Sequence, residues 1–257
     1  MHLTWLDSNS WLIEMGNQKI LLDPWLVGPL VFGNLPWLFK GTRTIEKPIP
    51  SAIDLILLSQ GLEDHAHPAT LQQLDHQIPV IGSPNAAKVV QQLGFTQVTA
   101  LSHGDSTTIG DLTIHAVPGS PIGPLLTENG YVLIDQTNQT KLYYEPHGNH
   151  SPTLRQFAPV DVVITPILDL EIPFVGSVIK GSQSAIELVE WLQPRAILPT
   201  AAGGDIEFAG VLLSVLRAKG GSAEFQQELA RRQLKTQLLE PKPAERLNVN
   251  DVLAAVG

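Results

Sequence analysis

The sequence predicts a single α/β domain over residues 1–257, and three observations support this. Short apolar or alternating runs of strand length dominate the first third, and strands alternate with helical segments later on. The chain has 257 residues, 43% of them apolar, so it is long and apolar enough to bury a substantial core. No linker, low-complexity tract or short repeat separates the segments, so we expect one layered domain.

The first third of the chain consists of predicted strands. Residues 3–6, 11–14 and 19–22 are short apolar or alternating runs, and Gly16-Asn17 is a turn signal between the last two. Residues 54–59 form a largely apolar run, which is typical of a strand covered on both faces.

The middle of the chain mixes both element types. The patterns predict helices at residues 68–74 and 85–93, with a strand at residues 79–81 between them. Three further strands are predicted at residues 112–117, 131–134 and 141–144.

Strands and helices alternate in the last third. Buried strands are predicted at residues 161–165 and 196–199, on either side of a helix over 182–192 with Ser182 as N-cap. Residues 206–219 are amphipathic and end at Gly220-Gly221, which predicts another helix. The preceding Gly203-Gly204-Asp205 is interpreted as a turn and the N-cap of that helix.

Composition excludes several functions. The formal charge is −9 with 16 basic and 25 acidic residues, so we expect no nucleic-acid partner and no attachment to anionic lipid. The absence of cysteine excludes disulfides, thiolate metal ligands and a cysteine nucleophile. Proline and glycine interrupt the longest apolar stretch, so no membrane span is predicted, and without a signal-peptide pattern we expect a cytoplasmic protein.

Titratable residues concentrate in two places, each shortly after a predicted strand. These are residues 63–67 (EDHAH) and residues 145–150 (EPHGNH). Sites in α/β folds usually lie just past the ends of buried strands. If the two strands are neighbours, imidazoles and carboxylates of both loops could bind one cation, and zinc accepts that mixture. Either loop taken alone is more often a capped turn than a metal site.

Apolar loops suggest a ligand pocket. Residues 24–39 carry Trp25, Phe32 and Trp37 in a segment too rich in Gly and Pro for a long helix, and residues 170–178, which include Phe174, could form the facing wall. These rings are predicted either to line a pocket for an apolar ligand, or to pack in the core or in a homo-oligomer contact.

Several motifs resemble metallo-β-lactamase-fold hydrolases along nearly the whole chain. Residues 4–6 (TWL), 11–14 (WLIE) and 20–25 (ILLDPW) are similar to the family's opening, particularly to small metal-dependent hydrolases with an early Asp-Pro. Residues 57–65 (LLSQGLEDH) align with the His-x-His-x-Asp-His loop, and residues 143–146 (YYEP) with a strand followed by Gly-Asp. The resemblance implies a metallo-β-lactamase-type four-layer αββα sandwich.

Most ligand positions of that family are altered. Gln60 and Leu62 occupy the two leading histidine positions, and only Asp64 and His65 match. The segments Gly119-Ser120-Pro121 and Thr200-Ala201-Ala202 stand where the family's two later histidines are expected. Leucine and proline side chains offer no ligand atom, and the amide of Gln60 is a poor substitute for imidazole, so the first metal site is predicted to be lost.

A second metal site is left open by the resemblance. It would use Asp64 and His65 with Glu145 or His147, and His67 or His150 could substitute. In the family the aspartate can also orient or deprotonate the attacking water, which makes Asp64 the candidate catalytic residue. We expect one divalent metal ion, with zinc as the favoured metal; the alternative is a metal-free protein. Asp23 would lie near the metal centre, or it would serve only in an Asp-Pro turn.

Two functions follow from this interpretation. The first is a divergent hydrolase with one metal ion that cleaves an ester or phosphoester with an apolar part. The second is a metal-free, catalytically silent member of the fold that binds an apolar small molecule or a partner protein. Both place a small-molecule substrate or ligand, or a partner protein, beneath the loops.

Overall fold

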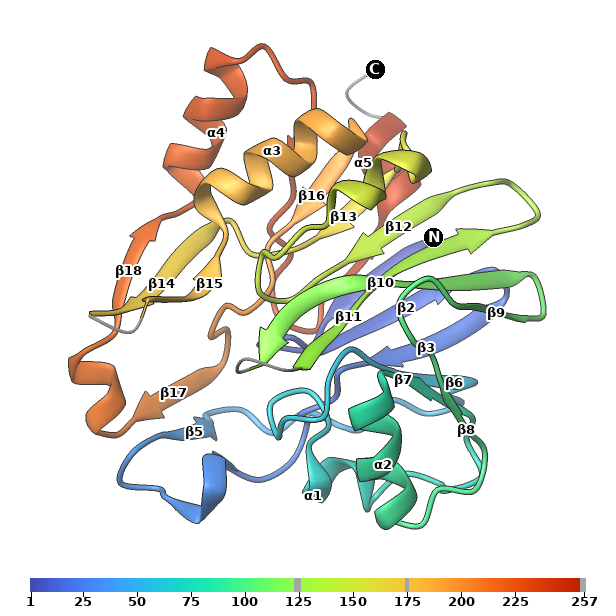
Figure 1. The fold of residues 1–257 in the computed structure, drawn as a ribbon, viewed down its shortest axis with the longest axis vertical. Coiled ribbons are helices and arrows are strands. Elements are labelled where there is room, and N and C mark those ends of the chain that lie inside the picture. The colour runs from blue at the N-terminus through green and yellow to red at the C-terminus, as the bar shows by residue number, and fades with distance from the viewer. Residues whose placement is uncertain (123–125, 174–175, 255–257) are drawn as a thin grey trace. The chain divides into compact units, whose positions relative to one another are not determined.

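The computed structural model describes residues 1–122, 126–173 and 176–254, and the chain divides into two units (Figure 1). Unit 1 consists of Met1–Ser102, Ala202–Ser214 and the described residues from Pro241 onward. Unit 2 consists of His103–Ala201 and Val215–Glu240. Each unit contains its own seven-stranded sheet, and the single domain predicted over residues 1–257 stays a prediction.

The main sheet of unit 1 begins as an antiparallel meander and continues with parallel strands. Its order is β20 (Arg246–Asn248), β1 (His2–Trp5), β2 (Trp11–Met15), β3 (Gln18–Leu22), β6 (Leu55–Leu58), β7 (Val80–Gly82) and β8 (Val98–Ala100). The β2–β3 hairpin closes through Gly16 and Asn17, both with φ of 57°. These positive angles suit a two-residue turn whose twist matches the strands, as the sequence predicted.

Helices cover one face of this sheet. In Figure 1, α1 (Pro68–Leu71) and α2 (Pro84–Gln92) lie beside β6 and β7. Leu71 and Val90 of the helices pack with Leu58 and other apolar strand residues in one buried cluster. Ser83 caps α2 by accepting from the Ala86 N–H, and Pro84 occupies its first turn.

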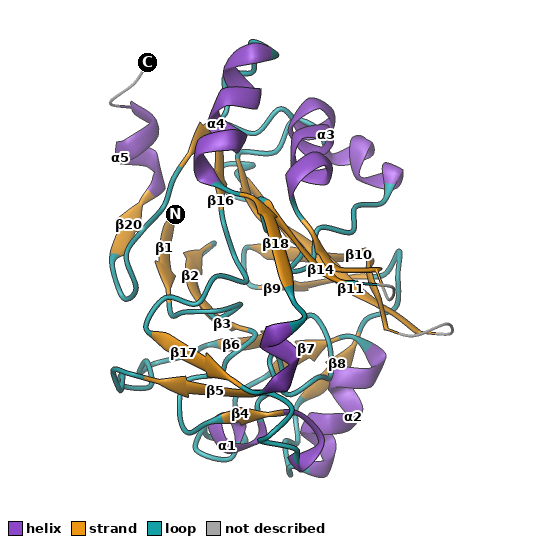
Figure 2. Cartoon of the chain, turned by 90° about the vertical axis from the view of Figure 1, so that its left-hand side faces the viewer, coloured by secondary structure: helices purple, strands orange, loops and turns teal. Residues whose placement is uncertain are grey.

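A small sheet completes unit 1. It has the order β17 (Ile206–Ala209), β5 (Lys40–Arg43), β4 (Leu30–Val31), as Figure 2 shows. The 3₁₀ turns η1 (Phe32–Asn34) and η3 (Val211–Ser214) belong to this region, and α5 (Val249–Ala254) follows β20.

Unit 2 has a mixed sheet. Its order is β19 (Gln237–Leu238), β16 (Ala196–Leu198), β13 (Val162–Ile164), β12 (Lys141–Tyr144), β11 (Leu126–Asp135), β10 (Leu112–Ile122) and β9 (Ser106–Ile109). A three-stranded sheet is ordered β15 (Gly176–Lys180), β14 (Leu168–Ile172), β18 (Arg217–Gly220). The helices are α3 (Ser182–Leu192), α4 (Ser222–Arg231) and the 3₁₀ segment η2 (Pro152–Phe157).

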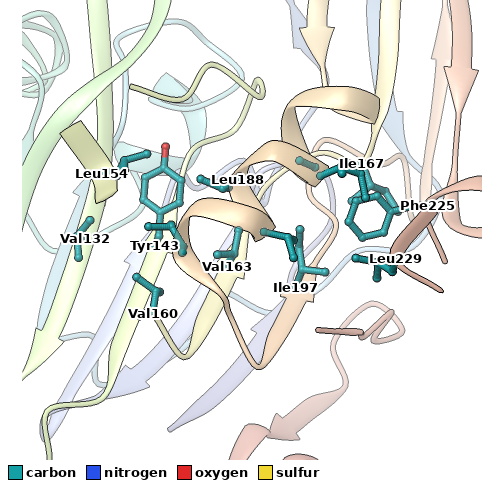
Figure 3. Packing of buried hydrophobic residues seen from close by; sticks show 14 of the residues in the cluster. Val132, Tyr143, Leu154, Val160, Val163, Ile167, Leu188, Ile197, Phe225 and Leu229 are labelled. Carbon is teal, nitrogen blue, oxygen red and sulfur yellow. The ribbon is translucent and has the colours of Figure 1, made fainter. Parts of the chain in front are cut away.

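The core of unit 2 lies between this sheet and its helices. Figure 3 shows Leu188 of α3 and Phe225 of α4 packed against Val163 and Ile197 of the central strands. Tyr143 belongs to the same cluster, and its side chain is fully buried. Burial of each such side chain stabilises the fold by about 1.5–3 kcal/mol, so this cluster fixes the strands from which the polar loops start.

The predicted helix over residues 206–219 is wrong. The segment forms β17, η3 and β18 instead. Gly210, with φ of 122°, interrupts any continuous helix, and antiparallel pairing with β5 and β14 satisfies the backbone groups of β17 and β18. Tertiary pairing therefore outweighs a pattern of helical spacing. The interpretation of Asp205 as a helix N-cap fails with it.

The boundaries of α3 agree with the sequence, but its cap does not. Gly181 is the N-cap, and the carboxylate of Asp169 accepts from the Ser182 N–H at 3.0 Å and also from the Ser182 hydroxyl. A residue of the neighbouring β14 thus supplies the acceptor that was predicted to come from Ser182. Within the residues that the structure describes, no helix is both long and apolar enough to cross a membrane.

Candidate functional site

The polar centre of unit 1 lies where two parallel neighbouring strands end. Asp23 directly follows β3 and Ser59 directly follows β6, and these strands pair in parallel register. The Asp23 carboxylate accepts from the Ser59 N–H at 2.7 Å and from the Ser59 hydroxyl at 2.5 Å. Both residues are fully buried. Asp23 therefore holds the start of the loop that carries Asp64 and His65.

The imidazole of His65 lies between two carboxylates. Its Nδ1 is 2.7 Å from Asp23 Oδ2, and its Nε2 is 3.1 Å from Asp64 Oδ2. His65 and Asp23 are fully buried, whereas the Asp64 side chain is 18% exposed. Unit 1 thus brings together the two predicted ligands Asp64 and His65, and adds Asp23 as the group that orients the ring.

This environment keeps His65 protonated. Burial by itself would lower the pKa of His65, but the charges of Asp64 and Asp23, and the hydrogen bonds to them, raise that pKa to about 10. At neutral pH the ring carries a positive charge and donates from both nitrogens. A metal ion bound to Nε2 would have to displace that proton.

His67 has a structural role in unit 1. Its Nδ1 accepts from the Thr70 N–H at 3.3 Å, which caps α1, and its Nε2 lies 3.3 Å from the carbonyl oxygen of Pro29. Burial, the largest effect, lowers the pKa of His67. Because both ring nitrogens are occupied locally, His67 does not substitute for a missing ligand in this conformation.

The polar centre of unit 2 is the loop after β12. Glu145 is fully buried, and its Oε1 accepts from the Ser120 hydroxyl. Its Oε2 accepts from the backbone N–H groups of His147 at 3.1 Å and of Asn149 at 2.7 Å. The two predicted ligands of this loop, Glu145 and His147, are therefore joined by a hydrogen bond from the His147 N–H, and the Glu145 carboxylate holds the loop backbone in place.

The pKa values of this second centre shift in a different way. Burial raises the pKa of Glu145 to about 7, although the Ser120 hydroxyl and the loop N–H groups act in the opposite direction. His150 is bonded through Nδ1 to the Tyr143 hydroxyl at 3.1 Å, and burial lowers the pKa of His150 to about 3. His150 is therefore neutral at pH 7.

The predicted pocket residues lie in different surroundings. Trp25 is fully buried, with Leu30 and Ile206 and with the partly buried Phe32, in a small cluster of unit 1. Trp37 is 63% exposed. Phe174 lies outside the described residues. A pocket wall formed by these rings stays a prediction, and of the three described rings Trp37 has the most accessible surface.

Several residues of these centres were not found from the sequence. Ser59 and Asn9, whose amide nitrogen is 3.5 Å from His65 Nε2, were missed in unit 1, and Ser120 and Tyr143 were missed in unit 2. Ser and Asn are too common in turns to stand out, and only the position of Ser59 at the end of an apolar strand was a usable signal.

The comparison with family models identifies the class of protein. Residues 2–201 match the model of the beta-lactamase superfamily domain. Because this match covers more than half of the chain, the chain belongs to that superfamily. The predicted family and the predicted α/β fold class of the metallo-β-lactamase type are confirmed.

Individual proteins also resemble this chain in sequence or in structure. A UPF0173 metal-dependent hydrolase of Halobacterium salinarum is 22% identical over 219 residues, which are 77% of this chain and 82% of that protein. Among solved structures, an isothiocyanate hydrolase from Delia radicum gut bacteria has a TM-score of 0.70 at 16% identity, covering 96% of this chain and 98% of its own. A possible metal-dependent hydrolase from Veillonella parvula has a TM-score of 0.71 at 13% identity, with the same coverages. These two structures support the fold alone.

Proposed function

We propose that this chain is a divergent metal-dependent hydrolase that uses one divalent ion to cleave an ester or phosphoester with an apolar part. The observation that carries the proposal is the imidazole of His65, oriented by Asp23 through Nδ1 and placed beside Asp64 through Nε2. An imidazole that binds a metal typically donates its other N–H to a carboxylate. The relatives named as metal-dependent hydrolases support the same chemistry.

The donor atoms in unit 1 fit a divalent ion. Two ligands at about 2.0–2.2 Å from a tetrahedral zinc ion lie roughly 3.3 Å apart. His65 Nε2 and Asp64 Oδ2 are 3.1 Å apart, so a small adjustment lets both bind one ion. The mixture of nitrogen and oxygen donors favours zinc among divalent ions. Glu145 or His147 as a further ligand stays a prediction from the sequence.

Each residue of unit 1 would have a distinct task. A divalent ion bound there would supply Lewis acidity, which lowers the pKa of a coordinated water. Asp23 would keep the Nδ1 proton of His65 and so leave Nε2 as the ligand. The Ser59 N–H and hydroxyl hold the Asp23 carboxylate in place. Asp64, whose carboxylate is more accessible than that of Asp23, would orient or deprotonate the attacking water.

The metal content of the protein tests the first half of this proposal. Protein purified without a metal-affinity tag is expected to contain about one divalent ion per chain by elemental analysis. His65→Ala should lose that ion, and His76→Gln, a change of a histidine packed against Phe95, should retain it. Absence of metal from the wild type, with chelator leaving its thermal unfolding unchanged, would instead favour the silent, ligand-binding alternative.

Turnover tests the second half. A panel of aryl esters, lactones and phosphodiesters, each with an apolar group, should include one hydrolysed substrate. An aromatic isothiocyanate belongs in the panel because one structural neighbour is named for that activity. Hydrolysis should disappear in Asp64→Ala, provided that this variant unfolds at a similar temperature. Activity that survives in folded Asp64→Ala would rule out the assigned role of Asp64.

Trp37 tests the apolar part of the substrate. Trp37→Ala is expected to raise KM several-fold for substrates with a large apolar group and to leave KM nearly unchanged for small ones. The ring is 63% exposed, so the fold should tolerate its loss. An equal change for both substrate classes would remove Trp37 from the proposed pocket.

A further inference from the structure

Exposed apolar side chains gather around the small sheet of unit 1. Phe208 of β17 is 38% exposed, and Ile45, Trp37 and Val211 are each more than half exposed. Trp37 and Val211 lie at one end of this sheet, where the Val211 N–H donates to the Trp37 carbonyl oxygen at 3.0 Å. Ile45 follows β5 at the other end. Large apolar residues that are exposed together usually mark an interaction surface.

Strand β17 forms an open edge of the small sheet. Figure 2 shows β17 beside β5, with the two-residue strand β4 on the other side of β5. Among the described residues, β17 pairs with no strand other than β5. Edge strands are commonly protected by lysine, proline or a bulge, and residues 206–209 (IEFA) have none of these. The edge is therefore able to accept another strand.

The backbone groups at this edge are those of Ile206 and Phe208. The Thr44 N–H donates to the Asp205 carbonyl oxygen at 2.9 Å, so residue 205 directs its carbonyl group toward β5. Every second residue of an antiparallel strand faces the same partner, so Glu207 also bonds to β5. The alternate residues, 206 and 208, direct their N–H and C=O groups away from β5. No backbone partner is found for them among the described residues.

A second copy of β17 fits this edge best in one antiparallel register. When Phe208 lies opposite the second copy's Phe208, their backbone groups point toward each other and both rings lie on one face. That face is apolar, because a Cβ on Gly41, the β5 residue opposite Phe208, would lie 2.5 Å from the Trp25 ring. A shift by one residue would put the two apolar faces on opposite sides of the joined sheet. A shift by two would place the two Glu207 side chains opposite each other.

The other face of the joined sheet is complementary in charge. It carries Glu207, Ala209 and the β5 residue Lys40, which pairs with Ala209. In the favoured register Glu207 lies opposite the second copy's Ala209, and that copy's Lys40 lies one strand further in the same row. Two strand spacings are about 10 Å, a gap that extended lysine and glutamate side chains bridge over the small alanine. Within the described residues neither Glu207 nor Lys40 forms an ion pair.

We propose that two copies of this chain associate through β17 and join their small sheets into one continuous antiparallel sheet. A strand added to an open edge gains backbone hydrogen bonds, and the side chains select the partner. The antiparallel arrangement also brings Val211, at the end of one β17, toward Ile45, beside the start of the other. A two-fold contact uses the same surface on both copies, so the assembly closes as a dimer. The inference depends neither on the proposed hydrolase function nor on the substrate contact proposed for Trp37.

The oligomeric state of the full chain tests this contact. Sedimentation equilibrium of the wild type is expected to give twice the mass of one chain, and the dimer should dissociate on dilution. Phe208→Lys should weaken the dimer at least about tenfold, because it removes the central apolar pair and places two like charges opposite each other. Val178→Lys introduces the same charge at a similarly exposed residue of β15 and should leave the dimer unchanged. Thermal unfolding confirms that each variant is folded.

An exchange of charges tests the register. Glu207→Lys should weaken the dimer several-fold, because it brings a second lysine toward the second copy's Lys40. Adding Lys40→Glu to that variant should restore the affinity, since opposite charges then face each other again across the contact.

Other outcomes would overturn the inference. A wild type that is monomeric at all concentrations, or a dimer as tight in folded Phe208→Lys as in the wild type, would exclude association through β17. Affinity that is not restored in the double variant of Glu207 and Lys40 would exclude the register. If Phe208→Lys does not fold, Phe208→Thr keeps a strand-forming residue, removes the apolar pair and should also weaken the dimer.

Discussion

The two polar loops of this protein use similar residues but neutralise their buried charge differently. After β6, the imidazole of His65 is placed between the carboxylates of Asp23 and Asp64 and remains charged. After β12, the carboxylate of Glu145 is surrounded by a hydroxyl and backbone N–H groups, which are dipoles without net charge. Dipoles offset burial only in part, so the pKa of Glu145 rises to about 7.

Residue type alone therefore does not set the protonation state of a buried group. A full opposite charge within about 3 Å outweighs desolvation in the first loop, and neutral donors at the same distance do not in the second. In the first loop, a metal ion could replace the Nε2 proton of His65. In the second loop, Glu145 changes its protonation state near neutral pH.

The largest effect is expected from removing one charge of the first loop. Asp23→Asn should lower the free energy of unfolding of metal-free protein by about 3–5 kcal/mol at pH 7, because it leaves a buried imidazole with one charged partner. The new amide would also face the donors of Ser59. Urea denaturation measures the loss. Asp64→Asn, at a more accessible carboxylate, should cost clearly less. Equal losses would contradict the ranking of the two partners.

The pH dependence of the first loop is next in size. The pKa of His65 is about 10 in the folded protein and 6.5 ordinarily, so the folded state binds the extra proton. Its contribution to stability is complete below pH 6.5 and is lost as pH rises toward 10, a change of roughly 3–5 kcal/mol. In metal-free His65→Gln the decline over this range should be smaller. Parallel curves for the two proteins would show that His65 is not the group responsible.

The second loop should lose stability in a lower pH range. Glu145 has an ordinary pKa of 4.5 and a folded pKa of about 7, so its protonated form is favoured in the fold. Stability therefore falls as pH rises from about 4.5 to 7. Glu145→Gln, which resembles the protonated acid in shape, should remove this decline and be roughly 1–3 kcal/mol more stable than wild type at pH 8. If Glu145→Gln is less stable than wild type at pH 8, the hydroxyl and N–H donors fully offset the desolvation of the ionised Glu145 carboxylate.

The smallest effects distinguish the two serines that donate to these carboxylates. Ser59→Ala removes a hydrogen bond to an ionised acceptor and should cost about 1.5–3 kcal/mol. Ser120→Ala removes one to a carboxyl group that is partly protonated at pH 7, and should cost only about 0.5–1.5 kcal/mol. The two losses are compared by denaturation at pH 7. A larger loss of stability for Ser120→Ala than for Ser59→Ala would mean that Glu145, and not Asp23, is the more strongly bonded acceptor.

Much of the fold was predictable because its signals are local. The β2–β3 hairpin follows from Gly16-Asn17, and the bounds of α3 follow from apolar spacing and Pro194. Residues 206–219 were mispredicted because β17 and β18 obtain their hydrogen bonds from β5 and β14, which lie far away in the sequence. A local pattern contains no information about such partners.

The family, the α/β class and the surviving Asp64-His65 pair could be predicted from the sequence, because motifs and apolar periods lie in consecutive residues. The groups that surround this pair depend on how distant strands pair in the folded chain. Asp23 and Ser59 meet because β3 and β6 are parallel neighbours, and Ser120 reaches Glu145 because of a bulge in β10. Charge and burial act through space, so the protonation of His65 and Glu145 depends on residues distant in the chain.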